Sequence, residues 1–184
     1  WFAWIDQNLE ILRQVKPILG APQLGRVDGT AAFKDGHGFV FLFNPNYRAL
    51  SAEFVLDTSI GLTSGGRFTL RQLYPDAEKG RLLAPPGKAF WRLGDKVTLP
   101  LAGAEALVLE VSAAPERLAQ PLLLGVVGQA ALSGGTLELA GVRGEVGSER
   151  RIGVVLPEGK QVASLTANGS RIAFRQTGPL VSLK

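Results

Sequence analysis

The sequence contains no cysteine and no methionine, and its single histidine is His37. Without cysteine, the chain can form neither a disulfide nor a thiolate metal site. One histidine cannot supply a two-histidine metal centre, and His37 stands in Asp-Gly-His-Gly, a hairpin-like setting. That setting favours a solvated turn residue over a catalytic base. We therefore expect no metal and no cofactor.

Long apolar runs and concentrated charge are missing as well. No apolar stretch approaches the roughly 18–20 residues of a membrane span, and the N-terminus lacks a basic signal region. The net charge is +4, but the 20 lysines and arginines are spread along the chain and only Arg150-Arg151 are adjacent. Phosphate recognition needs a basic patch or stripe. We therefore expect neither a membrane nor a nucleic acid as partner.

Catalytic motifs are not found either. There is no Gly-x-Ser-x-Gly elbow and no glycine-rich phosphate loop. Glycoside hydrolysis needs two carboxylates that flank the scissile bond, and nothing marks any two of the aspartates as such a pair. Most of them stand next to glycine in turn-like sequences. We predict that the chain itself is not an enzyme, although these aspartates are the candidates: Asp28, Asp35, Asp57, Asp76 and Asp95.

The chain opens on Trp1-Phe2-Ala3-Trp4, and with no methionine this start predicts a piece of a longer protein that begins inside a helix. Residues 1–16 show a helical period with a wide apolar stripe, and Pro17 is expected to end the helix. A stripe of this size needs a partner surface. It consists of Trp1, Trp4, Ile5, Leu9, Ile11, Leu12 and Val15.

After residue 25 the pattern changes to short strands separated by turns, which predicts an all-β antiparallel sandwich. The predicted strands are 29–34, 38–44, 51–57, 67–74, 96–101 and 105–112, then 122–127, 129–132, 136–140, 151–156, 162–167, 171–175 and 180–183. Residues 38–44 are apolar on both faces and should be central. Residues 75–95 read as a long loop with a short strand near Phe90-Trp91, and Asn168-Gly169 as a tight hairpin turn.

These elements divide the chain into four parts. Residues 1–24 form a helix and linker that end a missing catalytic domain, and residues 25–112 form the sandwich. Residues 113–121 are a connector, and residues 122–184 form a second, smaller β unit that is too small to be stable alone and either packs on the first or is completed by further sequence.

The aromatic residues allow two interpretations, because sugar rings stack on tryptophan and tyrosine. They either fill the ends of the sandwich, which is the favoured interpretation, or form a sugar platform. The residues concerned are Trp91, Phe90, Tyr47 and Tyr74, which lie in or near predicted loops.

The order of several segments resembles the rear of large bacterial glycoside hydrolases of the α-galactosidase (melibiase-like) kind. The segments are residues 4–9, 16–17, 25–30, Gly38-Phe-Val-Phe-Leu-Phe-Asn-Pro45, Leu73-Tyr74-Pro75, 94–100 and 105–111. In those enzymes the last helix of a (β/α)₈ barrel leads into an antiparallel β-sandwich.

The resemblance covers roughly residues 1–112 and implies that the catalytic carboxylates lie on barrel strands before Trp1. It implies a non-catalytic accessory region whose partners are the missing catalytic domain of the same chain and a polysaccharide. It also implies an extracytoplasmic or secreted protein. Two alternatives stay open: a free-standing carbohydrate-binding module, and an adhesion or protein-interaction sandwich.

Overall fold

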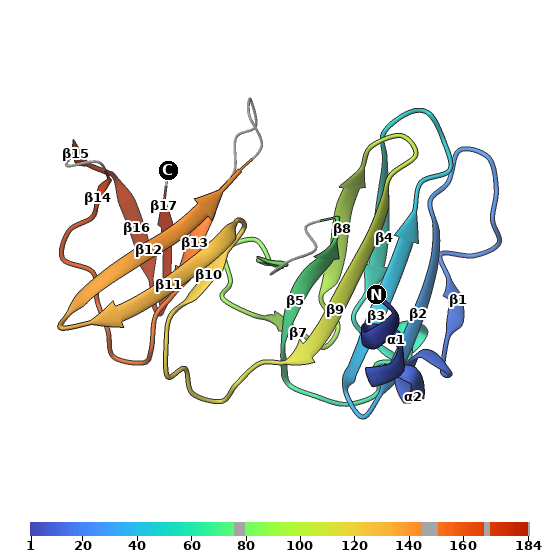
Figure 1. Ribbon diagram of the computed structural model, residues 1–184, viewed down its shortest axis with the longest axis horizontal. Helices are drawn as coiled ribbons and strands as arrows, with labels where there is room; N and C mark the ends of the chain where they lie inside the picture. Colours follow the sequence, from blue (N-terminus) through green and yellow to red (C-terminus); the bar gives the residue numbers. More distant parts are fainter. Residues whose placement is uncertain (76–79, 145–150, 168–169, 184) are drawn as a thin grey trace. The chain divides into compact units, whose positions relative to one another are not determined.

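The computed structural model describes residues 1–75, 80–144, 151–167 and 170–183 (Figure 1). Apart from two short helices and one 3₁₀ turn, the regular structure is β-strand, so the predicted all-β fold is confirmed. The chain divides into two compact units. Unit 1 contains Trp1–Glu78 and Phe90–Ala114, and unit 2 contains Lys79–Ala89 and Pro115–Lys184.

Unit 1 is an antiparallel sandwich of two layers. The larger layer has the strand order β1 (Lys16–Ile18), β2 (Asp28–Lys34), β3 (His37–Phe43), β9 (Ala106–Ala113) and β5 (Arg67–Tyr74), with β7 (Trp91–Arg92) also paired to β5. The smaller layer pairs β4 (Leu50–Val55) with β8 (Lys96–Leu101), and η1 (Thr58–Ile60) follows β4. The predicted strands 67–74 and 96–101 are confirmed with these same bounds.

The core of unit 1 lies between these two layers. In β3, Val40 and Leu42 are buried, and Val40 pairs across the sheet with the buried Leu109 of β9. β4 and β8 contribute buried side chains in alternation, among them Phe54 and Val97, which face each other in register. The same period of two is found in β5, so β4 and β5 each have one covered and one more exposed side. β3 lies between β2 and β9, as its apolar sequence predicted.

The hairpin between β2 and β3 turns at Asp35 and Gly36, which have φ values of 52° and 78°. Two successive residues with positive φ form the turn whose twist suits a two-residue hairpin. Lys34 and His37 therefore face each other across the turn. The tight hairpin predicted from Asp-Gly is confirmed, and it places His37 at the first position of a strand.

The single helix predicted over 1–16 is wrong in its extent. The structure has α1 (Phe2–Gln7) and α2 (Leu9–Leu12), and the chain then extends into β1. At the break, the Asn8 side chain donates to the Trp4 carbonyl at 2.8 Å and competes with the helical backbone bonds. Pro17 lies in the edge strand β1, where a missing N–H group is tolerated.

Unit 2 is a smaller β structure with its own core. Its sheet has the order β6 (Arg81–Leu83), β10 (Leu122–Leu124), β13 (Ile152–Val155), β17 (Leu180–Leu183) and β16 (Phe174–Thr177). Two further antiparallel pairs are described, β11 (Val127–Ser133) with β12 (Thr136–Arg143) and β14 (Thr166–Ala167) with β15 (Ser170–Arg171). The core is an apolar cluster of Leu123, Val126, Val154, Leu156 and Val181.

Two sequence predictions concern residues 75–95 and Asn168-Gly169. The predicted loop over 75–95 contains a strand, β6, which pairs in parallel with β10, so the prediction missed this element. The turn predicted at Asn168-Gly169 lies outside the described residues. Across the described ranges, no helix has the length and apolarity needed to cross a membrane.

Candidate functional site

The candidate site lies on the outer face of the larger sheet of unit 1, the side turned away from β4 and β8. Because side chains alternate along a strand, the residues between the core positions of β3 point to this face. The register then defines two neighbouring rows across β2, β3, β9 and β5. One row is Ala32, Phe39, Glu110 and Arg71, and the other is Thr30, Phe41, Val108 and Tyr74.

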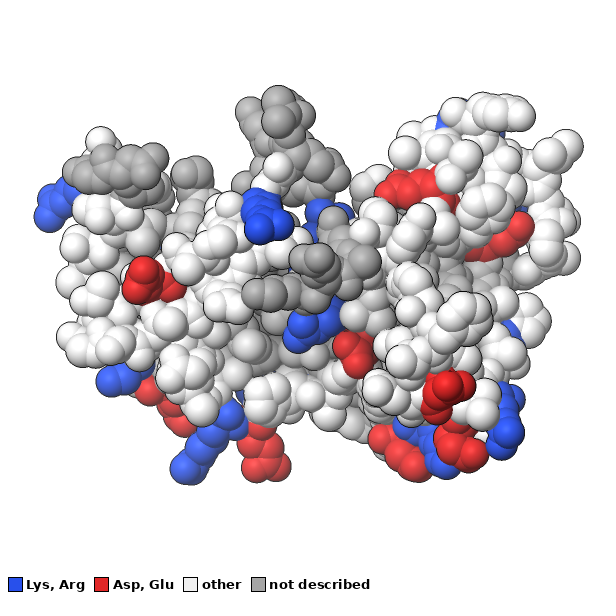
Figure 2. All heavy atoms as spheres, viewed as in Figure 1, with Lys and Arg blue, Asp and Glu red and all other residues white. Residues whose placement is uncertain are grey.

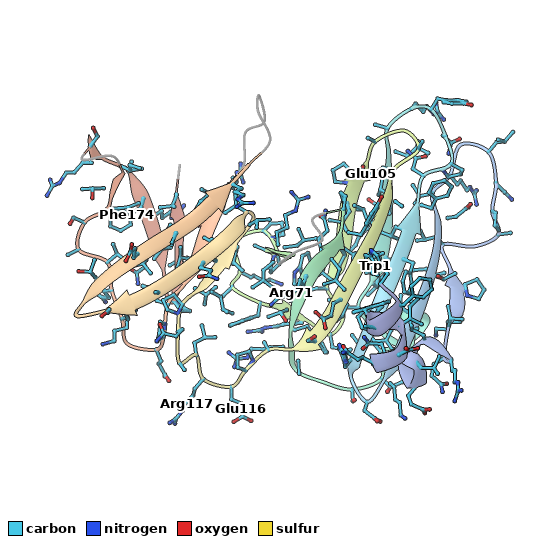
Figure 3. All side chains as sticks on the ribbon, viewed as in Figure 1. Trp1, Arg71, Glu105, Glu116, Arg117 and Phe174 are labelled. Carbon is cyan, nitrogen blue, oxygen red and sulfur yellow. The ribbon has the colours of Figure 1, made fainter. Side chains whose placement is uncertain are left out.

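The N-terminal helices cover part of this outer face, as Figure 1 shows for α1 and α2 in front of β2 and β3. The Trp4 ring lies edge-on to Phe39 at 4.7 Å, and Phe39 is fully buried. Trp1 contacts Trp4 at 5.3 Å and Tyr74 at 6.3 Å, so an aromatic row runs from β3 over the helix to the end of β5. Edge-to-face pairs of this kind contribute about 1 kcal/mol each beyond burial. Trp1 projects from this side of unit 1 in Figure 3.

A polar cluster adjoins the aromatic row. The Nε2 atom of His37 lies 3.1 Å from Oε1 of Glu110, and Nε of Arg71 lies 3.8 Å from Oε2 of the same carboxylate. The His37 ring also lies edge-on to Phe39 at 5.3 Å. His37 is thus held by a cross-strand partner, and the expectation of a freely solvated turn residue is corrected. No sequence pattern marks Glu110 or Arg71, because only the strand register brings them to His37.

The chemistry of this cluster is that of a partly exposed ion-pair network. The side chains of His37 and Glu110 retain 37% and 27% of their exposure, so solvent reaches both. Such pairs contribute little to stability, about 0–1 kcal/mol each. Across the described residues, no group of three or more His, Asp or Glu side chains is arranged to hold a metal ion.

The candidate aspartates have local structural roles. Asp57 caps η1, and its Oδ1 accepts a hydrogen bond from the Ser59 backbone N–H at 2.8 Å. Hydrogen bonds from the Ser59 side chain and backbone hold the pKa of Asp57 below its ordinary value. Asp95 accepts from the backbone N–H of Arg92 at 2.9 Å in the turn before β8. Asp35 forms the hairpin, Asp28 begins β2, and Asp76 lies outside the described residues.

The four aromatic candidates do not share one surface. Trp91 is 5% exposed and pairs opposite Phe68, so its ring belongs to the core and offers no face to a sugar, which corrects its assignment as a ligand contact. Phe90 is half-buried beneath the Arg67 guanidinium, 5.1 Å from its ring centre. Tyr74 is 41% exposed and lies beside Trp1 on the outer face. Tyr47 is fully exposed in the loop between β3 and β4.

The loop that carries Tyr47 is fixed by the buried side chain of Asn44. Asn44 is fully buried, and its Nδ2 donates to the carbonyls of Arg48, Leu101 and Ala102 at 2.8, 3.2 and 2.8 Å. Its Oδ1 accepts from the backbone N–H of Asn46 at 3.1 Å. Asn44 therefore ties the β3–β4 loop to the β8–β9 loop at one end of unit 1.

Comparisons with known proteins identify neighbours among solved structures only, since neither a protein-family model nor a curated protein sequence matches this chain. A β-L-arabinopyranosidase of family GH27 from Geobacillus stearothermophilus has a TM-score of 0.40 at 13% identity, over 55% of this chain and 20% of that one. A protein assigned as an α-N-acetylgalactosaminidase from Bacillus halodurans has 0.35 at 18%, over 54% and 21%.

A GH30 endoxylanase from Clostridium papyrosolvens has a TM-score of 0.33 at 16% identity, over 54% of this chain and 24% of that one. These neighbours are glycoside hydrolases, and the chain spans a quarter of their length or less. With TM-scores of 0.40 and below, these likenesses assign neither a substrate nor a reaction to this chain.

Proposed function

We propose that this chain is a non-catalytic accessory β-sandwich region of a glycoside hydrolase, and that its N-terminal helix docks it against the catalytic domain of the same protein. The proposal joins the sequence resemblance over residues 1–112 to one structural observation. The helical segment carries more apolar side chains than the sandwich covers.

This observation concerns the contacts that α1 and α2 make with the sheet and the side chains that they leave exposed. Trp4 is packed on Phe39, and Glu10 pairs with Lys34 at 3.4 Å, so the helix is attached to the sheet. Yet neither helix contains a buried residue. Four large apolar side chains remain exposed on this segment: Trp1 by 56%, Phe2 by 88%, Ile5 by 39% and Leu9 by 40%.

A helix whose apolar stripe is wider than the face in contact with the sheet is typically buried between two layers of structure. Full burial of a large apolar side chain contributes roughly 1.5–3 kcal/mol, so covering what remains of these four is worth on the order of 5 kcal/mol. The neighbouring Tyr74 and Phe43, also exposed on the outer face, extend the same surface. A domain that covers this side is stabilised by that burial free energy, which is lost when the helix stays exposed to solvent.

The proposal is tested first by activity. The isolated chain, assayed with chromogenic α- and β-galactosides, should show no hydrolysis above a buffer control, because the catalytic carboxylates belong to the domain that precedes it. Turnover by the chain that Glu110→Gln abolishes would place catalysis at the His37–Glu110 pair and overturn the proposal.

A second candidate function is a free-standing carbohydrate-binding module. The observation that favours it is the full exposure of Tyr47 on a loop with a rigid backbone. In that case sugar binding is the whole function, and no catalytic domain covers the outer face.

A further inference from the structure

We propose that the loop end of unit 1 around Tyr47 is a carbohydrate-binding site, in which one pyranose ring stacks on Tyr47 and its hydroxyl groups accept hydrogen bonds from Arg48. This site lies at the end of the sandwich, apart from the outer face to which the proposed function assigns the catalytic domain. It gives the accessory region a ligand, and it names the residues of the sugar contact that the second candidate function requires.

The first step is the position of the apolar side chains. Tyr47 is fully exposed, and Leu24, in the loop before β2, is 99% exposed. A large apolar side chain that is left in water forgoes the free energy of burial. The two loops are joined, because the Gly25 backbone N–H donates to Oδ1 of Asn46 at 2.8 Å and Nδ2 of Asn46 donates to the Arg26 carbonyl at 2.9 Å. Tyr47 and Leu24 therefore project from one connected loop end.

The second step is the rigidity of the backbone that carries Tyr47. Asn44 holds the Arg48 carbonyl, and the Asn46 carbonyl accepts from the Ala104 N–H at 2.9 Å. A Cβ atom at Gly103 would lie 2.3 Å from the Tyr47 carbonyl oxygen, so the β8–β9 loop backs Tyr47 directly. The residues on both sides of Tyr47 are thus fixed while its ring is free. A fixed backbone lowers the conformational entropy that the loop loses when a ligand binds.

The third step is the polar partner. An ideal Cβ atom at Gly25 would lie 3.5 Å from Nη2 of Arg48, so the guanidinium lies against the Gly25 backbone. Gly25 has a φ of 82°, a conformation that favours glycine and leaves room for this close approach. Arg48 thereby presents planar donors beside the exposed loop pair, and a guanidinium can bond two neighbouring hydroxyls at once.

An aromatic face beside a planar donor suits a sugar, whose ring has an apolar C–H face and a polar edge. Tyrosine stacks on the first, and arginine bonds the second. Because the loop end holds one exposed ring, a single contact of modest affinity is expected, and several such contacts along a polysaccharide raise the apparent affinity.

The test is affinity electrophoresis of the chain in gels that contain galactomannan, arabinan, xylan or polygalacturonate. At least one polysaccharide should retard the chain, and Tyr47→Ala should lower the affinity about tenfold, because the aromatic contact surface is lost. Tyr47→Trp should retain binding, and Arg48→Lys should weaken it. The matched control is Tyr74→Ala, which removes the only other tyrosine.

The outcomes separate this proposal from the proposed function. Retardation by none of the four polysaccharides, or equal retardation of the chain and Tyr47→Ala, overturns the Tyr47 site. Loss of binding in Tyr74→Ala alone moves the contact to the outer face and overturns it as well. Hydrolysis of galactosides by the chain contradicts the accessory role and leaves the Tyr47 result unaffected.

Discussion

The buried amide of Asn44 should be a principal determinant of the stability of unit 1. Its side chain donates to three backbone carbonyls and accepts from both the N–H and the Nδ2 of Asn46. Two amide hydrogens serve three carbonyls, so we count about four effective hydrogen bonds. At roughly 0.5–1.5 kcal/mol net for each, and with the carbonyls left partly unsatisfied, Asn44→Ala should cost about 3 kcal/mol.

The assay is urea unfolding followed by tryptophan fluorescence. All three tryptophans lie in unit 1, and Trp91 is in its core, so the signal reports this unit. With an m value of about 1–3 kcal/mol/M, a loss of 3 kcal/mol lowers the midpoint by roughly 1–3 M. Asn44→Asp should cost more than Asn44→Ala, because it places a carboxylate against the same carbonyl oxygens.

The matched control is Asn8→Ala, which removes one hydrogen bond, from Asn8 to the Trp4 carbonyl, in a half-buried position. It should cost about 1 kcal/mol or less. If Asn44→Ala and Asn8→Ala have the same midpoint, the network does not hold the loops together. The argument for a rigid Tyr47 then fails with it.

Two further predictions concern turns. Asp57→Ala should destabilise the chain at pH 7, because the folded pKa of Asp57 lies below its ordinary value of 3.8. The difference in free energy of unfolding from the parent chain should shrink as pH falls below 3.8, and a difference that does not depend on pH would refute this cause. Gly125→Ala should lower the free energy of unfolding of unit 2 by at least about 2 kcal/mol, because φ of Gly125 is 86° and the new Cβ would lie 2.2 Å from the Arg151 carbonyl oxygen. The control is Gly159→Ala, which should cost about 1 kcal/mol because φ is 76° but the space around it is open. Thermal unfolding followed by circular dichroism measures both.

The strands of unit 1 were predictable where a local pattern was sufficient. The alternation in residues 67–74 and the Asp35-Gly36 turn depend on neighbouring residues only, and both were found where the sequence placed them. The continuous apolar character of β3 also predicted its central position, because a strand covered on both faces needs apolar residues on both sides.

Features that depend on distant residues were not predictable. β1 was not predicted, because Lys16-Pro17-Ile18 has no strand pattern and is extended only by its pairing with β2. β6 forms because Leu82 pairs in parallel with Leu124, which follows some 40 residues later. The partner of His37 was hidden for the same reason, since Glu110 reaches it through the β3–β9 register.

Surface character was predictable only in part. Tyr47 and Tyr74 were both placed in or near loops by the sequence, yet one is fully exposed and the other lies beside Trp1 at the end of β5. Trp91 was assigned to the same group, and its pairing opposite Phe68 buries it. Figure 2 shows acidic and basic side chains interspersed over the visible face, in keeping with the even spread of charge along the chain.

The proposed docking role of the N-terminal helix is tested most directly by Phe2→Asp, made both in this chain and in a longer form that carries the catalytic domain we propose. Phe2 is 88% exposed, so in this chain the substitution should change the free energy of unfolding by less than about 0.5 kcal/mol. In the longer form it should cost about 3 kcal/mol, because a buried phenyl ring is replaced by a carboxylate. The control is Leu24→Asp, in the loop before β2, which should leave the free energy of unfolding unchanged in both forms. If Phe2→Asp also leaves it unchanged in the longer form, the account is contradicted.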